Sequence, residues 1–255
     1  SLDAWATLAG LAPLTTRLRL GTMVSPATFR HPSVLARMAT TVDHVSGGRV
    51  EVGLGAGWYE REHVENGFPF LDASARFQLF AEQVEVLVRT WTEQAFDHRG
   101  AHYQLRRQTA LPRPLQRPHP PLVLGGRAGR RAAALAARFA SEYNTLGAPL
   151  EQLRERRRRL DEACAAAGRD PATLGCSLMV TTVVADDRAT LAERLRRVRE
   201  LTGREPPPHW LVGTVEELAE RLAELGAVGI SRVLLQHLDH RDLDAVAAMG
   251  RLARA

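Results

Sequence analysis

Residues 125–129 have the composition of an anion-binding turn. Their sequence is Gly-Gly-Arg-Ala-Gly, and it joins an apolar run to a helical run. Small residues let backbone N–H groups approach an anion at a helix N-terminus, where the helix dipole also favours negative charge. Arg127 or Arg130 can pair with a phosphate there. An ordinary tight turn between a strand and a helix is the competing interpretation.

A second glycine-rich segment, residues 53–57, follows another apolar run. It lacks the GxGxxG spacing of dinucleotide sites and the lysine of the P-loop, so packing explains its glycines as well as cofactor contact does. Trp58 follows directly and can stack on a ring or close the mouth of a barrel. His237 also ends an apolar run, although single histidines are more often structural, and His31 is better explained as a helix-entry residue.

Other catalytic and metal-binding patterns are missing from the sequence. It contains no HExxH motif, no Ser-His-Asp order and no clear pair of acid and base carboxylates, so no metal site is predicted. Cys164 and Cys176 form no CxxC motif and are interpreted as reduced, partly buried thiols of a cytoplasmic protein. No apolar run is long enough to cross a bilayer, and no signal peptide opens the chain.

The elements that must position these residues alternate between strands and helices. Apolar residues of the segment 31–46 recur at three- and four-residue steps, with Pro32 at the start and Gly47 at the stop, which predicts an amphipathic helix. Thr214 and Glu217 have the spacing of a capping box. The predicted strands are 17–24, 50–55, 122–125, 142–146, 176–185 and 232–238, and the predicted helices are 31–46, 74–91, 129–139, 150–167, 189–201, 215–225 and 243–253.

Regular strand-helix repetition predicts a parallel sheet, either a barrel or a doubly wound sheet. A barrel needs eight strands, and two of them are missing here. The proline-rich segment 95–120 breaks the alternation and is interpreted as an insertion with a small hairpin near residues 101–105. We therefore expect residues 1–255 to form a single domain that is incomplete at its N-terminus.

The charge pattern does not favour a nucleic-acid partner. The net charge is +5, and all 34 basic residues are arginine. The densest run, residues 154–159, shares a predicted helix with Glu151, Glu155 and Glu162, so a solvated helix face is the better explanation. The expected partner is a small-molecule substrate, with no nucleic acid and no membrane.

The sequence resembles the luciferase-like flavin and deazaflavin oxidoreductases over essentially its whole length. The version Gly55-Ala56-Gly57-Trp58 most resembles the branch that depends on the deazaflavin coenzyme F420. The motifs that carry the resemblance, in chain order, are Leu20-Gly-Thr-Met-Val24, Arg30-His-Pro32, Ala36, Ala39, Asp43, Ser46-Gly-Gly-Arg49, Val52-Gly-Leu-Gly-Ala-Gly-Trp58, Glu62, Gly67, Phe70, Pro121-Leu-Val-Leu-Gly-Gly126, Ala136-Ala-Arg-Phe139, Asn144, Gly168-Arg-Asp-Pro171 and Gly213-Thr-Val-Glu-Glu217.

This resemblance implies an α/β fold, the TIM (β/α)8 barrel of the bacterial luciferase type, with the first strand-helix-strand portion absent and the chain starting in the next helix. The family's acidic residue and histidine near the cofactor ring belong to that portion, so no catalytic residue is assigned. The cofactor contacts that the resemblance implies are Thr22, Met23, Val24, Gly55, Ala56, Gly57, Trp58, Gly126, Arg127, Ala128 and Thr145.

Three functions remain open after the resemblance. The leading one is hydride transfer between reduced F420, at its C5 position, and an unknown organic substrate. The others are FMN-dependent monooxygenation and a non-catalytic, truncated relative. F420 carries a tail of glutamates that FMN lacks, so Arg61, Arg127 and Arg130 favour F420.

Three structural expectations follow. Alternation along neighbouring strands should turn Arg19 and Glu51 inward as a pair, with Leu18 and Leu20 facing the helices. The resemblance implies a non-prolyl cis peptide at Met23-Val24. The unpaired sheet edge at residues 18–23 should promote association, so we expect this segment alone to be unstable, aggregated or oligomeric, and a homodimer is one such outcome.

Overall fold

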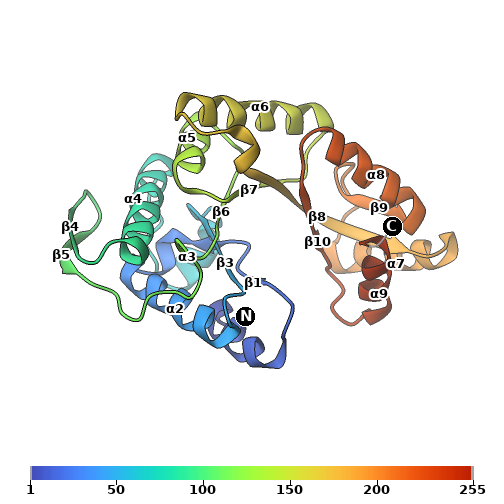
Figure 1. The fold of residues 1–255 in the computed structure, drawn as a ribbon. Helices are drawn as coiled ribbons and strands as arrows, with labels where there is room; N and C mark the ends of the chain where they lie inside the picture. Colours follow the sequence, from blue (N-terminus) through green and yellow to red (C-terminus); the bar gives the residue numbers. More distant parts are fainter. Residues whose placement is uncertain (1, 254–255) are drawn as a thin grey trace. The chain divides into compact units, whose positions relative to one another are not determined.

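The computed structural model describes residues 2–253 as helices and parallel strands in two units (Figure 1). Unit 1 contains the chain up to Gly125 together with Leu135–Glu142, and unit 2 contains Gly126–Ala134 and the chain from Tyr143 onward. The helix α5 (Arg130–Phe139) therefore contributes to both.

Strand β3 (Val50–Gly55) is the centre of the sheet in unit 1. It pairs in parallel with β1 (Leu20–Gly21), β2 (Ser25–Pro26) and β6 (Leu122–Gly125). Both faces of β3 are covered, because five of its six residues are buried, as is typical of a parallel strand between helical layers. The helices of unit 1 are α1 (Ala4–Leu11), η1 (Ala12–Leu14), η2 (Ala27–Phe29), α2 (Pro32–Ser46), α3 (Glu60–Glu65) and α4 (Ala73–Thr92).

Helix α2 forms where the sequence predicts it. His31 is its N-cap, and its side chain accepts a hydrogen bond from the Ser33 amide. Gly47 ends the helix with φ of 67°, in the left-handed conformation that glycine adopts at little cost. The strand predictions 50–55 and 122–125 are confirmed to the residue, and α1 confirms that the described chain begins with a helix.

The prediction of one strand over residues 17–24 is wrong. Only Leu20–Gly21 and Ser25–Pro26 pair with β3, because a bulge with a cis Met23-Val24 peptide separates them. Leu18 does not face the helices, since it is 62% exposed. The predicted ion pair is confirmed, with Arg19 Nε 2.6 Å from Glu51 Oε1, but the Arg19 side chain is 47% exposed and does not lie inward as expected.

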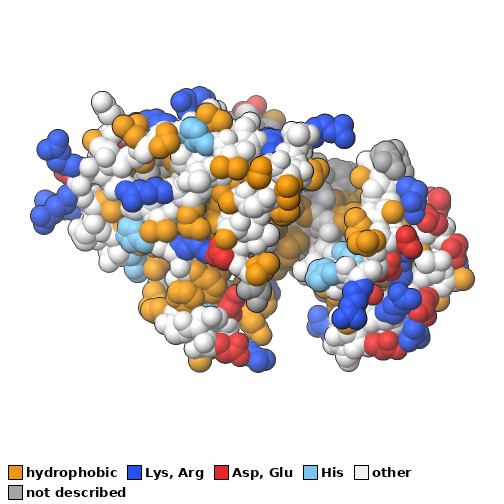
Figure 2. Space-filling view, turned by 90° about the horizontal axis from the view of Figure 1, so that it is seen from below, with side chains coloured by type: hydrophobic (Ala, Val, Ile, Leu, Met, Phe, Trp, Pro, Cys, Tyr) orange, Lys and Arg blue, Asp and Glu red, His pale blue; other side chains and the backbone are white. Residues whose placement is uncertain are grey.

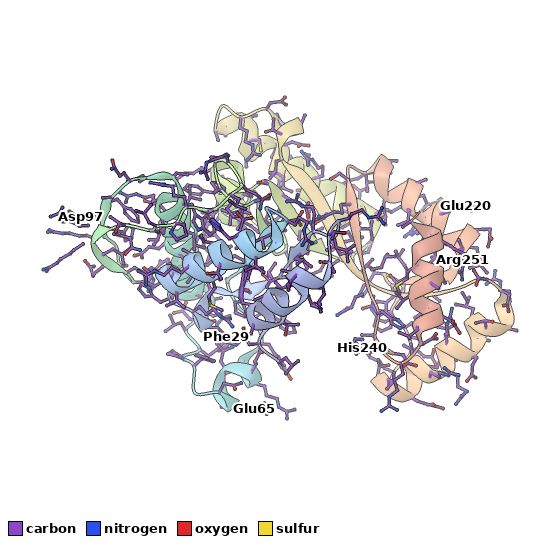
Figure 3. All side chains as sticks on the ribbon, turned by 60° about the horizontal axis from the view of Figure 1, so that its bottom comes forward. Phe29, Glu65, Asp97, Glu220, His240 and Arg251 are labelled. Carbon is purple, nitrogen blue, oxygen red and sulfur yellow. The ribbon has the colours of Figure 1, made fainter. Side chains whose placement is uncertain are left out.

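The proline-rich segment contains a hairpin, as predicted, with strands on either side of the expected position. Strands β4 (Phe96–Arg99) and β5 (Gln104–Gln108) pair antiparallel. Asp97, labelled in Figure 3, lies on the first of them. The carboxylate of Glu82 on α4 anchors the hairpin, because it accepts hydrogen bonds from His98 Nε2 and from the amides of His102 and Tyr103.

Two family-motif residues of unit 1 have structural roles. The buried carboxylate of Asp43 accepts hydrogen bonds from the amides of Leu115 and Gln116 and so holds the proline-rich segment against α2. The guanidinium of Arg49 donates to the carbonyls of Ala12 and Leu18, among others, which fixes the chain before β1. Neither side chain is therefore available as a ligand.

Strand β8 (Gly175–Ala185) is the centre of the sheet in unit 2. Its first half pairs in parallel with β10 (Arg232–Gln236), and its second half pairs in parallel with β9 (Leu211–Thr214), a strand that the sequence analysis missed. The capping box between Thr214 and Glu217 is confirmed. The other elements are β7 (Glu142–Leu146), which begins at the last residue of unit 1, and the helices α6 (Leu150–Ala166), η3 (Pro171–Thr173), α7 (Arg188–Thr202), α8 (Val215–Ala227) and α9 (Leu243–Leu252).

The charged surface of unit 2 consists largely of arginine and carboxylate pairs. Figure 2 shows acidic and basic side chains interleaved over the region formed by α7 and α9. Arg154, Arg158 and Arg159 of α6 pair with glutamates of the same helix, which confirms the predicted solvated face for these three residues. Within residues 2–253, no helix is both long and apolar enough to cross a membrane. Cys164 and Cys176 are both buried.

Candidate cofactor site

Unit 1 holds the predicted contact residues Thr22, Met23 and Val24 in the bulge between β1 and β2. The Met23-Val24 peptide is cis, as the resemblance implies. The hydroxyl of the buried Thr22 donates to the carbonyl of Gly53 at 2.8 Å. Farther along the bulge, the buried Trp5 of α1 donates its ring N–H to the Ser25 hydroxyl at 3.1 Å. The bulge is therefore held from both sides by hydrogen bonds.

Three glycines on two neighbouring strands make room for this bulge. A Cβ at Gly53 would lie 1.7 Å from the Thr22 carbonyl oxygen, and a Cβ at Gly55 would lie 2.8 Å from a methyl of Val24. At Gly125, on β6, it would lie 3.2 Å from both Val24 methyls. The glycines let the Val24 side chain seat against the strand ends, so their packing role is established by the geometry.

The loop after β3 is shaped by a histidine that the sequence analysis missed. His63 of α3 is 1% exposed, and its two ring nitrogens lie 2.7 Å from the Thr28 hydroxyl and 2.8 Å from the Tyr59 carbonyl oxygen. Gly57 has φ of 78° and passes over these groups, since a Cβ there would lie 3.1 Å from the Thr28 hydroxyl. Its helical setting in α3, with Phe29 and Phe70 edge-on, marks His63 as a buried structural group.

Trp58 extends from this loop with 83% of its surface exposed. It therefore does not close the mouth of a barrel, which was one of its two interpretations. Ala56, between Gly55 and Gly57, is half-buried. The exposed indole is available for stacking on a planar ligand, which was the other interpretation.

A cavity of about 810 Å³ lies in unit 1 next to the bulge. Its lining includes the predicted contacts Thr22, Met23 and Val24, together with the ion pair of Asp3 and Arg30. Phe29, labelled in Figure 3, is on the wall and stacks on Phe68, with ring centroids 4.5 Å apart. Its volume is within the usual range of small-molecule and cofactor sites.

Unit 2 holds the predicted contacts Gly126, Arg127 and Ala128 in the turn before α5. The amide of Ala128 donates to the Tyr143 hydroxyl at 2.9 Å, and a Cβ at Gly126 would lie 2.8 Å from that same oxygen. Burial raises the pKa of Tyr143 to about 12, so the phenol is neutral at ordinary pH. Since the Ala128 amide already has an acceptor, an anion would be bound by the N–H groups of the first turn of α5 and by the exposed Arg127.

Thr145, the last predicted contact, ends β7 with 1% of its surface exposed. Its hydroxyl accepts a hydrogen bond of 2.7 Å from Arg156 of α6. The same Nη1 atom donates to the Leu146 carbonyl oxygen at 2.8 Å. The predicted solvated helix face is wrong for Arg156, because its side chain turns back to the strand end and is only partly exposed.

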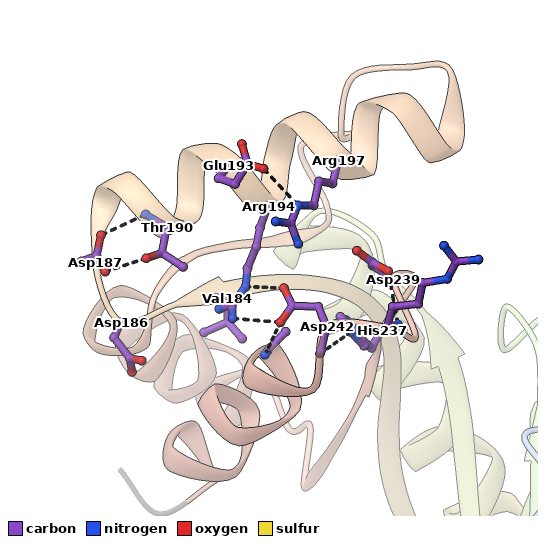
Figure 4. Close-up of polar contacts among 12 residues, drawn as sticks. Val184, Asp186, Asp187, Thr190, Glu193, Arg194, Arg197, His237, Asp239 and Asp242 are labelled. Atoms are coloured by element: carbon purple, nitrogen blue, oxygen red, sulfur yellow. Dashed lines mark hydrogen bonds and ion pairs between the residues drawn. The ribbon is translucent and has the colours of Figure 1, made fainter.

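His237 belongs to a different cluster of unit 2, shown in Figure 4. Its Nε2 lies 3.2 Å from the Asp242 carbonyl oxygen, and the Asp242 carboxylate pairs with Arg194 of α7. Arg194 also donates to the Val184 carbonyl oxygen. The cluster joins β8, α7 and α9, so the structure gives His237 a structural contact.

The fold is that of an α/β protein with parallel strands, and each unit carries predicted cofactor contacts at its strand ends. The family model described as luciferase-like monooxygenase matches residues 1–209. The chain belongs to the luciferase-like monooxygenase family, and the α/β fold of the luciferase-like barrel type predicted from the sequence is confirmed.

Individual relatives differ in cofactor. An FMNH(2)-dependent dimethylsulfone monooxygenase of Pseudomonas putida is 27% identical over 260 residues, which cover 88% of this chain and 70% of that protein. An uncharacterized protein of Mycobacterium tuberculosis is 31% identical over 201 residues, covering 79% and 67%. The structure of an F420-dependent secondary alcohol dehydrogenase in complex with an F420-acetone adduct has a TM-score of 0.81 at 20% identity and covers 93% of this chain and 79% of that one.

Proposed function

We propose that this protein is an F420-dependent oxidoreductase that exchanges a hydride with a small organic substrate. The observation that carries the choice of F420 is a pair of uncompensated cations in unit 2. Arg127 and Arg130 are exposed at the start of α5, and neither has a carboxylate partner among residues 2–253. Most other exposed arginines of unit 2 are paired with an acid, so these two are available to an anionic ligand.

Each unit, taken by itself, carries residues that are compatible with one part of such a cofactor. The glycine-seated Val24 and the exposed Trp58 of unit 1 supply apolar surfaces for a planar ring. The turn at Gly126 and Arg127 in unit 2 supplies N–H groups and positive charge for a phosphate. When bound, the deazaflavin supplies hydride chemistry at C5, while this chain's residues bind and orient it.

The test is a titration of the protein with F420 and with FMN at two salt concentrations, followed by tryptophan fluorescence. F420 should bind more tightly, and its binding should weaken with salt because exposed charge pairs are screened within about 8–10 Å at ordinary ionic strength. Replacing both Arg127 and Arg130 with Met should remove that salt dependence. Arg221→Met is the control, since Arg221 is a partly exposed arginine of unit 2 paired with Glu224.

FMN-dependent monooxygenation is the second candidate, and the Pseudomonas putida relative favours it. FMN binding more tightly than F420, without a salt effect on either, would replace the proposal with this one. Oxygen consumption in the presence of FMNH2 and candidate substrates would then identify the activity. Absence of binding to either cofactor would support a non-catalytic relative.

A further inference from the structure

Arg156 differs from every other arginine in the run 154–159. The other four form ion pairs with carboxylates of their own helix, whereas Arg156 has no carboxylate partner among the described residues. A partly buried cation without a counter-charge is unfavourable unless something else compensates it. The pairs formed by its neighbours are Arg154 with Glu151, Arg157 with Asp161, Arg158 with Glu155 and Glu162, and Arg159 with Glu155.

The hydrogen bonds of Arg156 leave half of its guanidinium free. Both of its bonds come from Nη1, one to the Thr145 hydroxyl and one to the Leu146 carbonyl oxygen, so Nε and Nη2 have no acceptor among residues 2–253. Thr145 accepts in this contact, and its own hydroxyl hydrogen has no acceptor there either. Two donors of Arg156 and one of Thr145 are thus uncommitted at the end of β7.

The same strand face connects these donors to the turn before α5. Tyr143 and Thr145 are two residues apart on β7, so their side chains lie on one face. Tyr143 bonds to the Ala128 amide, and Thr145 bonds to Arg156. Arg127 directly precedes Ala128, whose amide bonds to Tyr143, so its backbone lies at the same strand end. Burial lowers the pKa of Arg156, and the positive charge of Arg127 lowers it further.

We propose that Arg156 and Thr145 complete a phosphate-binding site with Arg127, in which Nε and Nη2 of Arg156 and the Thr145 hydroxyl donate to the phosphate oxygens of the cofactor. The arginine is held in place before binding by its two Nη1 bonds, so little side-chain entropy is lost when the anion arrives. The identity of the cofactor rests on the proposed function, but the binding of a phosphate group does not.

Two measurements test the proposal with the full chain. The first is the melting temperature at increasing inorganic phosphate, which should rise for the wild type. The second is the affinity for FMN, F420 and riboflavin, which lacks the phosphate. Arg156→Met and Arg156→Gln should abolish the phosphate effect and weaken FMN and F420 on the order of 10- to 100-fold, as expected for lost charge-assisted hydrogen bonds. Riboflavin affinity should not change.

Arg154→Met is the control, because Arg154 is an exposed neighbour on the same helix, and it should behave as the wild type. Arg156→Gln keeps a donor for Thr145 and Leu146, so it separates the loss of charge from a loss of folding. Equal phosphate stabilisation of all four proteins, no stabilisation of any of them, or equal weakening of FMN and riboflavin would overturn the proposal. Phosphate stabilisation that depends on Arg156, without binding of either phosphorylated cofactor, would support this site and refute the proposed function.

Discussion

Two successive strand ends of unit 2 are capped by an arginine from the following helix, and only one of them has a counter-charge. At the end of β8, Arg194 of α7 donates to the Val184 carbonyl oxygen and pairs with Asp242 at 2.7 Å. At the end of β7, Arg156 of α6 donates to the Leu146 carbonyl oxygen and has no carboxylate partner within residues 2–253. The difference separates a completed structural contact from a cation that is available to a ligand.

Burial explains why the first pair must be complete. The side chains of Arg194 and Asp242 are each only 10% exposed, and an unpaired charge at that depth would be costly. Asp242 is also the N-cap of α9, where its side chain accepts from the Ala245 amide. Arg156 is less buried, so the lack of a carboxylate partner among the described residues is less costly there.

The largest expected effect comes from breaking the completed contact. Asp242→Asn preserves the N-cap, because Asn and Asp are similar caps, but leaves Arg194 without a carboxylate. The free energy of unfolding in urea should fall by about 3–5 kcal/mol. Arg156→Met should change it by less than about 1 kcal/mol without ligand.

Asp72→Asn is the control for the substitution, since Asp72 is an exposed N-cap of α4. It should be nearly neutral. If Asp242→Asn and Arg156→Met destabilised the protein equally, the two strand ends would not differ in the way described.

Gly53→Ala tests whether close packing holds the strand ends of unit 1 in place, as an ion pair holds the end of β8. Gly53→Ala would place a methyl against the main chain of Thr22, which cannot move without shifting the bulge. We expect a loss of at least about 1–3 kcal/mol, measured by thermal unfolding. Gly10→Ala, in α1 with nothing near its Cβ position, should instead stabilise by about 0.5–1 kcal/mol. If Gly53→Ala and Gly10→Ala were equally stable, close packing at Gly53 would be refuted.

The pH dependence of stability should show that the Asp242 carboxylate is the group that stabilises the end of β8. The hydrogen bond from Arg194 holds the pKa of Asp242 below its ordinary value, which is near 3.8. The contribution of the pair is therefore fully present above that value and is lost as the pH falls through the folded-state pKa. The stability difference between the wild type and Asp242→Asn should be constant from pH 7 to about 5 and should narrow below about pH 4. A difference that narrowed near neutral pH would point to another group.

The smallest effect should come from the outer face of α6. Arg154→Met removes an ion pair whose side chains are 59% and 84% exposed, so stability should change by less than about 0.5 kcal/mol. Urea unfolding of Arg154→Met and Arg156→Met under the same conditions compares the two losses of stability directly. If Arg154→Met lowered the free energy of unfolding more than Arg156→Met did, the exposed ion pairs would contribute more to stability than their exposure indicates.

Much of the fold could be predicted from local pattern. Strands β3 and β6 have apolar residues bounded by glycine or charge, and helices such as α2 have caps that are visible in the sequence. The segment 17–24 looked like one strand because the bulge that interrupts it depends on contacts with β3. Strand β9 was missed because its four residues run directly into α8 without a turn.

The candidate site was less predictable, for a physical reason. Glycine-rich turns and Trp58 are local signals, and they led to the expected strand ends. The role of Arg156 depends on which neighbouring arginines already have an acid, and six consecutive residues of similar pattern do not show this. His63 carried no signal beyond its place in a short helix, since its burial comes from Thr28 and the aromatic rings around it.

The pairing of β8 with two different strands along its length affects how this part of the chain opens locally. Its residues 177–181 bond to β10 and its residues 182–185 bond to β9, and nine of its eleven residues are buried. Strand β7 also neighbours β8, so release of either β9 or β10 exposes half of one edge of β8 while the other half of that edge stays paired. Hydrogen–deuterium exchange should therefore proceed in two separate steps along this one strand, with the amides facing β9 and those facing β10 exchanging at different rates.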